Sequence, residues 1–445
     1  MTQKKKSLNA VFEDYETKPV PEEKRGHWWD QGMVWTGIAF CLIAFVVGGQ
    51  LGAAMDFKSV VIAVISGALI LTAIASLVGV IGARTHLTAT MTARFSLGVY
   101  GAKIFGIVIM LSNFGWYGYQ CNYFGSSAVY IIQLFTENAG TVVMWTLIGG
   151  FLMCVTAIIG FKGIKWLSNI GVPLLFILVF VAFFITLRNV PMETVTAASQ
   201  AAGLTKAMTI PAAMTTVIGS FVTTACYIPD ISRYSKRDKD AVVGSFIGFL
   251  ISFCIIQLIG AYFACAYGTA DLSDIFINKV GLGVFAGFVL IVATWTTNDN
   301  NLYSAVLGLS NAIGTDRIPR WLLTAIFGVL STILGAFGLV NYFIGFLNIL
   351  GVCIPPFGAA MIVDYYIYNR TNGLYQYENI EKLPNIRIVP FVSAAFGIVI
   401  GLLCTYTTIF AGLTAFLSAS IISMIATLLC QIVLAAATKK GTFTV

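Results

Sequence analysis

The stretch Val292-Ala-Thr-Trp-Thr-Thr-Asn-Asp-Asn-Asn-Leu-Tyr303 lies inside a segment, residues 282–313, that is otherwise apolar enough to cross a bilayer. Seven of its side chains are Thr, Asn or Asp. Polar groups buried in hydrocarbon are costly, so they usually face a partner, a cavity or a ligand. Bonding between neighbouring helices explains one such residue, but this density indicates a membrane-buried polar site. With about 3.6 residues per turn, four of these side chains share one stripe: Thr294, Thr297, Asn298 and Asn301.

The composition is that of an all-α polytopic membrane protein. Of the 445 residues, 58% are hydrophobic and only 10% are charged. A bilayer core needs about 20 apolar residues per helix, and the pattern predicts twelve spans, with polar tails at 1–32 and 438–445 and a polar linker at 364–385. The predicted spans are residues 33–55, 59–83, 102–135, 140–161, 166–187, 210–228, 241–268, 282–313, 320–338, 340–363, 386–407 and 409–437.

The distribution of Lys and Arg predicts the orientation. If the N-terminal tail is cytoplasmic, 22 of the 26 Lys and Arg residues lie on the cytoplasmic side. Such a bias predicts a cell-membrane protein with both termini in the cytoplasm. The formal net charge of +7 therefore follows from topology, and no basic soluble face indicates a nucleic-acid partner. No obligate protein partner is indicated either.

The same sequence lacks the signals of an enzyme, a metalloprotein or a channel. The nine cysteines lie singly in apolar spans, and the two histidines, His27 and His86, are far apart. Neither a disulfide framework nor a metal cluster is predicted, and no cofactor motif or activated nucleophile is present. A channel would show rings of charge or a repeated carbonyl filter, so a carrier is the favoured class.

Two predicted spans carry signals of an interruption. Residues 33–55 contain Gly37 and Gly48-Gly49, and residues 210–228 contain Gly219-Ser220-Phe221 ahead of Pro229. Glycine also permits close helix packing, whereas proline within a span breaks the hydrogen-bond ladder. Interrupted segments that open each of two halves predict an inverted-repeat transporter with a site near the midplane. The predicted repeats are residues 33–187 and 210–363, followed by two appended helices in residues 386–437.

The third span suggests the kind of ligand. Asn113, Trp116 and Gln120 share one helix face. An indole with an amide about one turn away on each side suits a flat heterocycle, because the ring stacks and the amides bond its edge. The alternative is a Trp that packs in the protein core with its N–H satisfied.

Four sequence runs carry a resemblance to a known family. The runs are Trp295-Thr-Thr-Asn-Asp-Asn300, Ala93-Arg-Phe-Ser-Leu-Gly98, Gly219-Ser220-Phe221, and Ile354-Pro-Pro356 with Asp364-Tyr365. With them the chain resembles the nucleobase-cation-symporter-1 family, and most closely its bacterial cytosine permease branch. The similarity covers nearly the whole chain and implies twelve helices, a five-plus-five LeuT-like inverted repeat and alternating access.

The resemblance implies a substrate site and a sodium site. A planar base would stack between Trp116 and Phe221, beside Gly219 and Ser220. Its edge would bond to the amides Asn298, Gln120 and Asn113. Sodium would bind the hydroxyls of Thr296 and Thr297 together with backbone carbonyls of Ala293, Ile38 and Cys41.

The chain also departs from the family pattern. Asn113 stands where cytosine permeases have glutamine, while Gln120 matches the hydantoin carriers. Leu42 and Ala293 replace residues that are polar in relatives. The predicted substrate is therefore a flat hydrogen-bonding heterocycle, cytosine or a purine, with a hydantoin-like, allantoin-like or pyrimidine-precursor compound as the alternative. Proton coupling through the buried carboxylate of Asp299 is the alternative to sodium.

Overall fold

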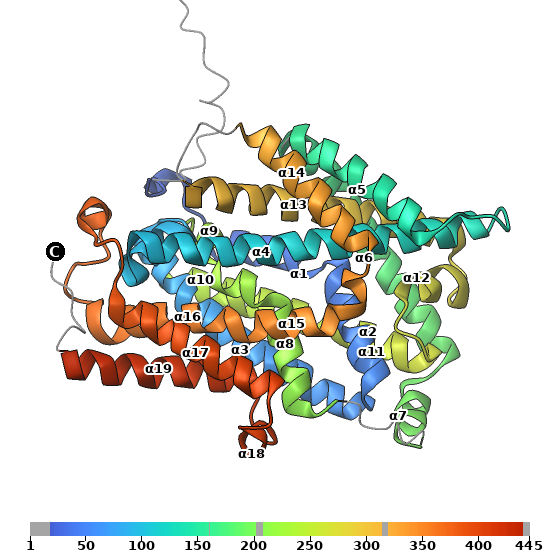
Figure 1. The fold of residues 1–445 in the computed structure, drawn as a ribbon. Coiled ribbons are helices and arrows are strands. Elements are labelled where there is room, and N and C mark those ends of the chain that lie inside the picture. Colours follow the sequence, from blue (N-terminus) through green and yellow to red (C-terminus); the bar gives the residue numbers. More distant parts are fainter. Residues whose placement is uncertain (1–17, 160, 202–207, 314–318, 439–445) are drawn as a thin grey trace, which may run out of the picture.

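In the computed structural model, the chain is built almost entirely of helices (Figure 1). The structure describes residues 18–159, 161–201, 208–313 and 319–438. Most of the predicted N-terminal tail, residues 1–17, and nearly all of the predicted C-terminal tail, residues 439–445, lie outside the described residues.

The helices follow the predicted order in three groups. The first group holds η2 (Glu22–Lys24), α1 (Trp28–Ala39), α2 (Leu42–Ala54), α3 (Phe57–Thr85), α4 (Ala89–Gln133), α5 (Val142–Ile159), α6 (Phe161–Asn189) and α7 (Met192–Ala201). The second holds α8 (Ile210–Cys226), α9 (Pro229–Ser232), α10 (Asp238–Ser245), η3 (Phe246–Ser252), α11 (Phe253–Tyr267), α12 (Leu272–Asp274), η4 (Ile275–Lys279), α13 (Gly283–Ile313), α14 (Arg320–Ala336), η5 (Leu339–Tyr342), α15 (Phe343–Cys353), α16 (Pro355–Val363) and η6 (Asp364–Asn369). The third holds η7 (Tyr377–Lys382), α17 (Ile388–Tyr406), α18 (Ala411–Thr414) and α19 (Ala419–Thr438).

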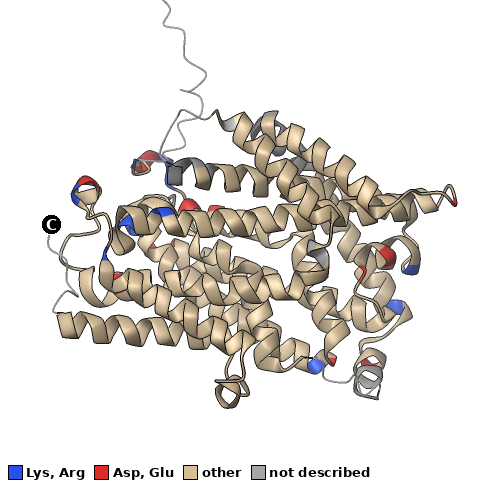
Figure 2. Ribbon diagram, viewed as in Figure 1, with Lys and Arg blue, Asp and Glu red and all other residues tan. Residues whose placement is uncertain are grey.

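Apolar length identifies the membrane spans. Among the described helices, seven are long and apolar enough to cross a bilayer, or eight if the bent pair α1–α2 is one span. Shorter apolar stretches lie in α5, α6 and α14, so the count of twelve stays a prediction. Figure 2 shows most charged residues at the two ends of the bundle, which leaves its middle apolar.

The two halves of the chain exchange their first helices, in the sense that the first helix of each half packs against the other half. In the first half, α2 packs along α11 of the second half; in the second half, α8 packs along α3 of the first. The long helices α4 and α13 pack against each other at the centre. This exchange is what an inverted repeat requires, because the opening helix of each half lies against the second helix of the other.

Two helices begin earlier than the sequence pattern predicts, because polar residues cap them. The helix α1 begins at Trp28, where the His27 backbone N–H donates to the Asp30 carboxylate over 2.9 Å. The helix α4 begins at Ala89, inside the predicted connector, and bends at Gly98, whose φ is +80°. The backbone N–H of Ala89 donates to the Asp230 carboxylate over 2.8 Å. This bond satisfies one of the backbone N–H groups at the start of a helix that have no acceptor within the helix.

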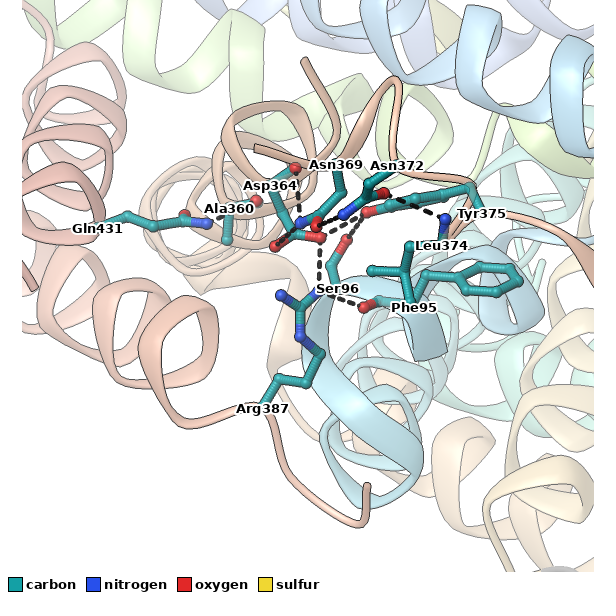
Figure 3. A network of polar contacts seen from close by, with 10 residues as sticks. All are labelled: Phe95, Ser96, Ala360, Asp364, Asn369, Asn372, Leu374, Tyr375, Arg387 and Gln431. Carbon is teal, nitrogen blue, oxygen red and sulfur yellow. Dashed lines mark hydrogen bonds and ion pairs between the residues drawn. The ribbon is translucent and has the colours of Figure 1, made fainter. Parts of the chain in front are cut away.

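A buried polar network ties several elements together at the end of the bundle that holds α9 and residues 370–387 (Figure 3). We call this end the inner end, after the predicted orientation. Arg387 donates to the Asp364 carboxylate over 2.7 Å, and both side chains are at most 4% exposed. Tyr375 donates to the same carboxylate over 2.8 Å. Because breaking a buried ion pair is strongly destabilising, these contacts hold η6, the linker and the start of α17 together.

Candidate functional site

The first membrane span is broken near its middle. The helices α1 and α2 meet at an angle of 55°. The break lies at Phe40, with ψ 55°, and Cys41, with ψ 153°. The last carbonyls of a helix have no intrahelical donor, so the carbonyls at Gly37, Ile38 and Ala39 are available at this break. The predicted interruption of the span is confirmed, although it lies between the glycines that suggested it.

The paired glycines of this span have a packing role. A Cβ on Gly48 would lie 1.9 Å from the Gln257 carbonyl oxygen of α11, and one on Gly52 would lie 2.5 Å from that of Ala261. From the other side, a Cβ on Gly260 would lie 2.2 Å from the Phe45 carbonyl oxygen. These residues let the two backbones approach closely, as small residues do in membrane helices. The hypothesis that Gly48-Gly49 unwinds the helix is therefore wrong.

A cavity of about 510 Å³ lies beside the break. Its volume is within the range of small-molecule sites. The walls come from α1, α4, α6, α8, α9 and α13, mainly from their portions near the inner end. The residues that line it are Met33, Val34, Trp35, Gly37, Ile38, Phe40, Cys41, Ile109, Asn113, Gly171, Leu175, Thr223, Thr224, Tyr227, Asp230, Ile231, Ala293, Thr296, Thr297, Asn300, Asn301 and Ser304.

The five residues of the predicted sodium site all line this cavity: Ile38, Cys41, Ala293, Thr296 and Thr297. The hydroxyls of Thr296 and Thr297 donate to the Ala293 carbonyl oxygen over 2.9 Å and 3.0 Å. Three oxygen atoms of α13 are thereby gathered opposite the broken end of α1. Hard cations prefer such oxygen ligands, and no carboxylate is required among them.

The predicted substrate residues of α4 are split between the cavity and the core. Asn113 lines the cavity, and its amide N–H donates to the Ile109 carbonyl over 3.1 Å. Trp116 is buried at 7% exposure, and its ring lies edge-on to Phe343 and Phe346 of α15, at 5.9 Å and 5.3 Å between centroids. Aromatic residues of α15 therefore cover the predicted stacking ring.

Within the described part of the chain, the buried side chain of Gln120 has no hydrogen-bond partner. The side chain is 1% exposed, and neither its amide nitrogen nor its amide oxygen contacts a partner. An unpaired buried polar group costs about 1–3 kcal/mol, so buried amides are nearly always bonded. A side chain left in this state, on the same helix face as Trp116, is available to a polar ligand.

The predicted substrate residues of α8 lie away from the cavity. Phe221 packs against Phe253 and Phe249, with centroid distances of 4.6 Å and 5.5 Å. The Ser220 hydroxyl donates to the Val217 carbonyl over 2.7 Å. A Cβ on Gly219 would lie 1.8 Å from the Leu347 carbonyl oxygen, so this glycine permits close packing of α8 on α15.

Asn298 faces the protein, not the cavity. Its side chain is fully buried, and the amide nitrogen lies 3.2 Å from the Tyr117 carbonyl oxygen and 3.1 Å from the Met153 sulfur. The side chains of consecutive residues on a helix point in directions about 100° apart. Asn298, the residue after Thr297, thus points toward α4 and α5. Asn298, predicted to bond the edge of the heterocycle, therefore does not line the cavity, and its amide oxygen has no hydrogen-bond partner among the described residues. Asp299 also points to α5, where its carboxylate accepts from the Thr156 hydroxyl over 2.8 Å.

Several cavity residues were not among the predicted site residues. Asn300, Asn301 and Ser304 continue the cavity face of α13, and Thr223, Thr224 and Tyr227 line the same cavity from α8 and its C-terminal end. The polar run of α13 was the signal for the first group. No pattern in the sequence distinguishes which of its faces meets the cavity, because polar residues occupy both.

Known proteins resemble the chain over nearly its full length. It is 29% identical to the cytosine permease of Escherichia coli over 384 residues, which cover 86% of this chain and 87% of that one. The hydantoin permease of Microbacterium maritypicum is 24% identical over 378 residues, 77% of this chain and 76% of the other.

The likeness extends to solved structures. The structure of Mhp1, a nucleobase-cation-symport-1 family transporter in a closed conformation with bromovinylhydantoin bound, matches with a TM-score of 0.75 at 18% identity, covering 96% of this chain and 95% of that one. This likeness confirms the predicted all-helical, LeuT-like fold. A profile of permeases for cytosine/purines, uracil, thiamine and allantoin matches residues 19–409. The chain therefore belongs to this family of membrane permeases, and it is not an enzyme.

Proposed function

We propose that the chain imports a nucleobase-like planar heterocycle, cytosine or a purine, together with sodium, by alternating access. It would act in the cell membrane with both termini in the cytoplasm. The observation that carries the assignment to a flat, hydrogen-bonding heterocycle is the buried amide of Gln120, which has no partner among the described residues and lies on the same helix face as Trp116. The cytosine and hydantoin permeases among its relatives support a compound of this class.

The gathering of oxygen atoms in the cavity supports sodium as the coupling ion. Thr296, Thr297 and the Ala293 carbonyl meet the broken end of α1 there. Asp299, the carboxylate that a proton-coupled carrier would use, lies on the other face of α13 against Thr156. An ion site between α1 and α13 would also couple the two halves of the chain energetically, so that sodium and substrate bind cooperatively.

A hydantoin-like or allantoin-like substrate is the second candidate. Gln120 favours it, because a glutamine at this position matches the hydantoin carriers rather than the cytosine permeases. The amide offers a donor NH2 group and an acceptor oxygen side by side, which suits the adjacent C=O and N–H groups of either kind of ring.

A thermal-shift panel on the purified protein tests both assignments. Cytosine, uracil, adenine, hydantoin and allantoin are each added in sodium and in choline at fixed pH. Stabilisation by a base that is larger in sodium is the expected result, because a ligand stabilises the state that it binds. Equal stabilisation in both salts contradicts sodium coupling, and transport lost on Asp299→Asn while insensitive to sodium would establish the proton alternative.

A further inference from the structure

A buried amide on α11 lies beside two residues of the predicted substrate site. The Gln257 side chain is fully buried, and its amide nitrogen lies 3.4 Å from the Ser220 hydroxyl oxygen. Among the residues that the structure describes, no group donates a hydrogen bond to its amide oxygen. One turn before Gln257, Phe253 at the start of α11 contacts the ring of Phe221, and so does Phe249 of the preceding η3. One face of α11 therefore lies along Ser220 and Phe221.

Hydrogen-bond accounting fixes the orientation of this amide. The single proton of the Ser220 hydroxyl goes to the Val217 carbonyl, 2.7 Å away. The hydroxyl can then only accept from Gln257, so the amide nitrogen must face it. The oxygen of Gln257 is left as a free acceptor. If the amide were flipped, its oxygen would face the Ser220 hydroxyl oxygen, and neither could donate a hydrogen bond to the other.

The helix that carries this amide has no room to shift. A Cβ on Gly48 would lie 1.9 Å from the backbone oxygen of Gln257, and one on Gly260 would lie 2.2 Å from the Phe45 oxygen. Close packing of α2 on α11 thus fixes the position of Gln257. A buried acceptor held without a partner is destabilising, and a ligand that supplies the missing donor would remove this cost.

We propose that Gln257 is a specificity-determining residue for the substrate. Its oxygen accepts a hydrogen bond from an amino group or ring N–H of the heterocycle that stacks on Phe221. This inference rests on the proposed function and adds a residue from α11, a helix outside the predicted site. A ligand with an amino group at that edge binds better than its oxo analogue, because a carbonyl there would oppose the free oxygen of Gln257.

The substitution Gln257→Met tests the proposal, because methionine keeps the length of the side chain and removes both polar atoms. We expect affinity for the amino-bearing base, cytosine, to fall by about tenfold, and the preference for cytosine over uracil to disappear. The melting temperature without ligand should stay the same or rise, because an unpaired buried acceptor is gone. A merely structural amide predicts the reverse pattern, with lower stability and unchanged affinity.

Gln431 of α19 offers a matched control. It is 1% exposed, its nitrogen donates to the Ala360 carbonyl over 3.3 Å, and its oxygen also lacks a partner. Figure 3 shows it at the inner end, on a helix appended to the two repeats. Gln431→Met should alter stability to a similar extent without changing the affinity for cytosine or uracil.

The outcomes separate this inference from the proposed function. If the parent protein binds none of the tested bases, the proposed function and this inference fail together. If the parent binds a base and folded Gln257→Met binds it equally well, the inference alone is overturned. Should that variant not fold, Gln257→Asn, which withdraws the amide by one methylene, is measured in the same way. Its undiminished affinity and unchanged base preference would equally overturn the inference.

Discussion

The spans that open the two halves of the chain break in different ways. The first bends by 55° at Phe40–Cys41, between α1 and α2, and opens onto the cavity. The second runs as one helix, α8, past Gly219 and ends only at Tyr227, ahead of the short helix α9. In sequence the two spans carry similar signals, yet only the first is broken in the middle of the membrane.

The difference shows what glycine does in this molecule. Gly48 of the first span and Gly219 of the second both lie against a backbone carbonyl of another helix, with no room for a Cβ. Both glycines therefore serve helix packing. The backbone break at Cys41 needs no glycine, because the dihedral angles there are open to any residue. The broken span offers backbone oxygens to the predicted ion site, whereas the continuous span offers side chains to the predicted substrate site.

The largest effect is expected where a methyl group would meet backbone. Gly219→Ala and Gly48→Ala should each lower the free energy of unfolding by about 3 kcal/mol or more, at the upper end of overpacking costs, because a carbonyl cannot turn away as a side chain can. Gly345→Ala and Gly37→Ala are the controls, since nothing lies within 4 Å of either added Cβ. Melting temperatures in detergent give the comparison, and equal effects of all four changes would contradict the packing role.

The next largest effect is expected from the loss of an ion ligand opposite the broken span. Thr297→Ala should weaken sodium binding by about 1.5–3 kcal/mol, as for a hydrogen bond to a charged group. Substrate affinity should fall with it, because the two sites are coupled. Titrations of sodium and of substrate measure both affinities.

Asn298→Ala, on the other face of α13, is the matched control for Thr297→Ala. Its contacts with Tyr117 and Met153 predict lower stability with unchanged sodium affinity. A sodium affinity that survives Thr297→Ala unaltered would remove this residue from the site.

Substitutions at the predicted stacking rings, one of them on the continuous span, should affect substrate affinity and leave sodium affinity unchanged. Phe221→Ala should weaken binding of the base by about 1–3 kcal/mol, the range for the loss of a stacking ring, and Trp116→Ala should do the same. Sodium affinity without substrate should stay unchanged, since neither ring lines the cavity that holds the predicted ion ligands. Binding of the base measured by calorimetry checks this, and full affinity in folded Phe221→Ala would exclude its ring as a wall.

The smallest effect is expected at the break itself. Cys41→Ala and Ile38→Ala should change sodium affinity by less than about 0.5 kcal/mol, the usual range for changes without a specific interaction. The reason is that backbone carbonyls, and not these side chains, would bind the ion. A loss comparable to that of Thr297→Ala in either variant would show that a side chain takes part.

The tertiary contacts explain why part of the site could be predicted and part could not. Thr296, Thr297 and Ala293 were predicted to meet the first span near Ile38 and Cys41, and all five line one cavity. Asn298 was predicted to bond the heterocycle from the same stripe of α13 as Thr297, and it lies against α4 and α5. Spacing along a helix gives the relative directions of side chains, whereas the neighbouring helices decide which direction is open.

By itself, the sequence determined the membrane class, the order of the helices and the polar character of α13, because long apolar stretches and buried polar residues have few alternatives in a bilayer. Only the tertiary structure decided where the first span breaks and which glycines pack against a carbonyl. It also decided that Gln257 of α11 lies beside Ser220. These features depend on the approach of segments hundreds of residues apart, such as Gly48 and Gln257, and no local pattern records that approach.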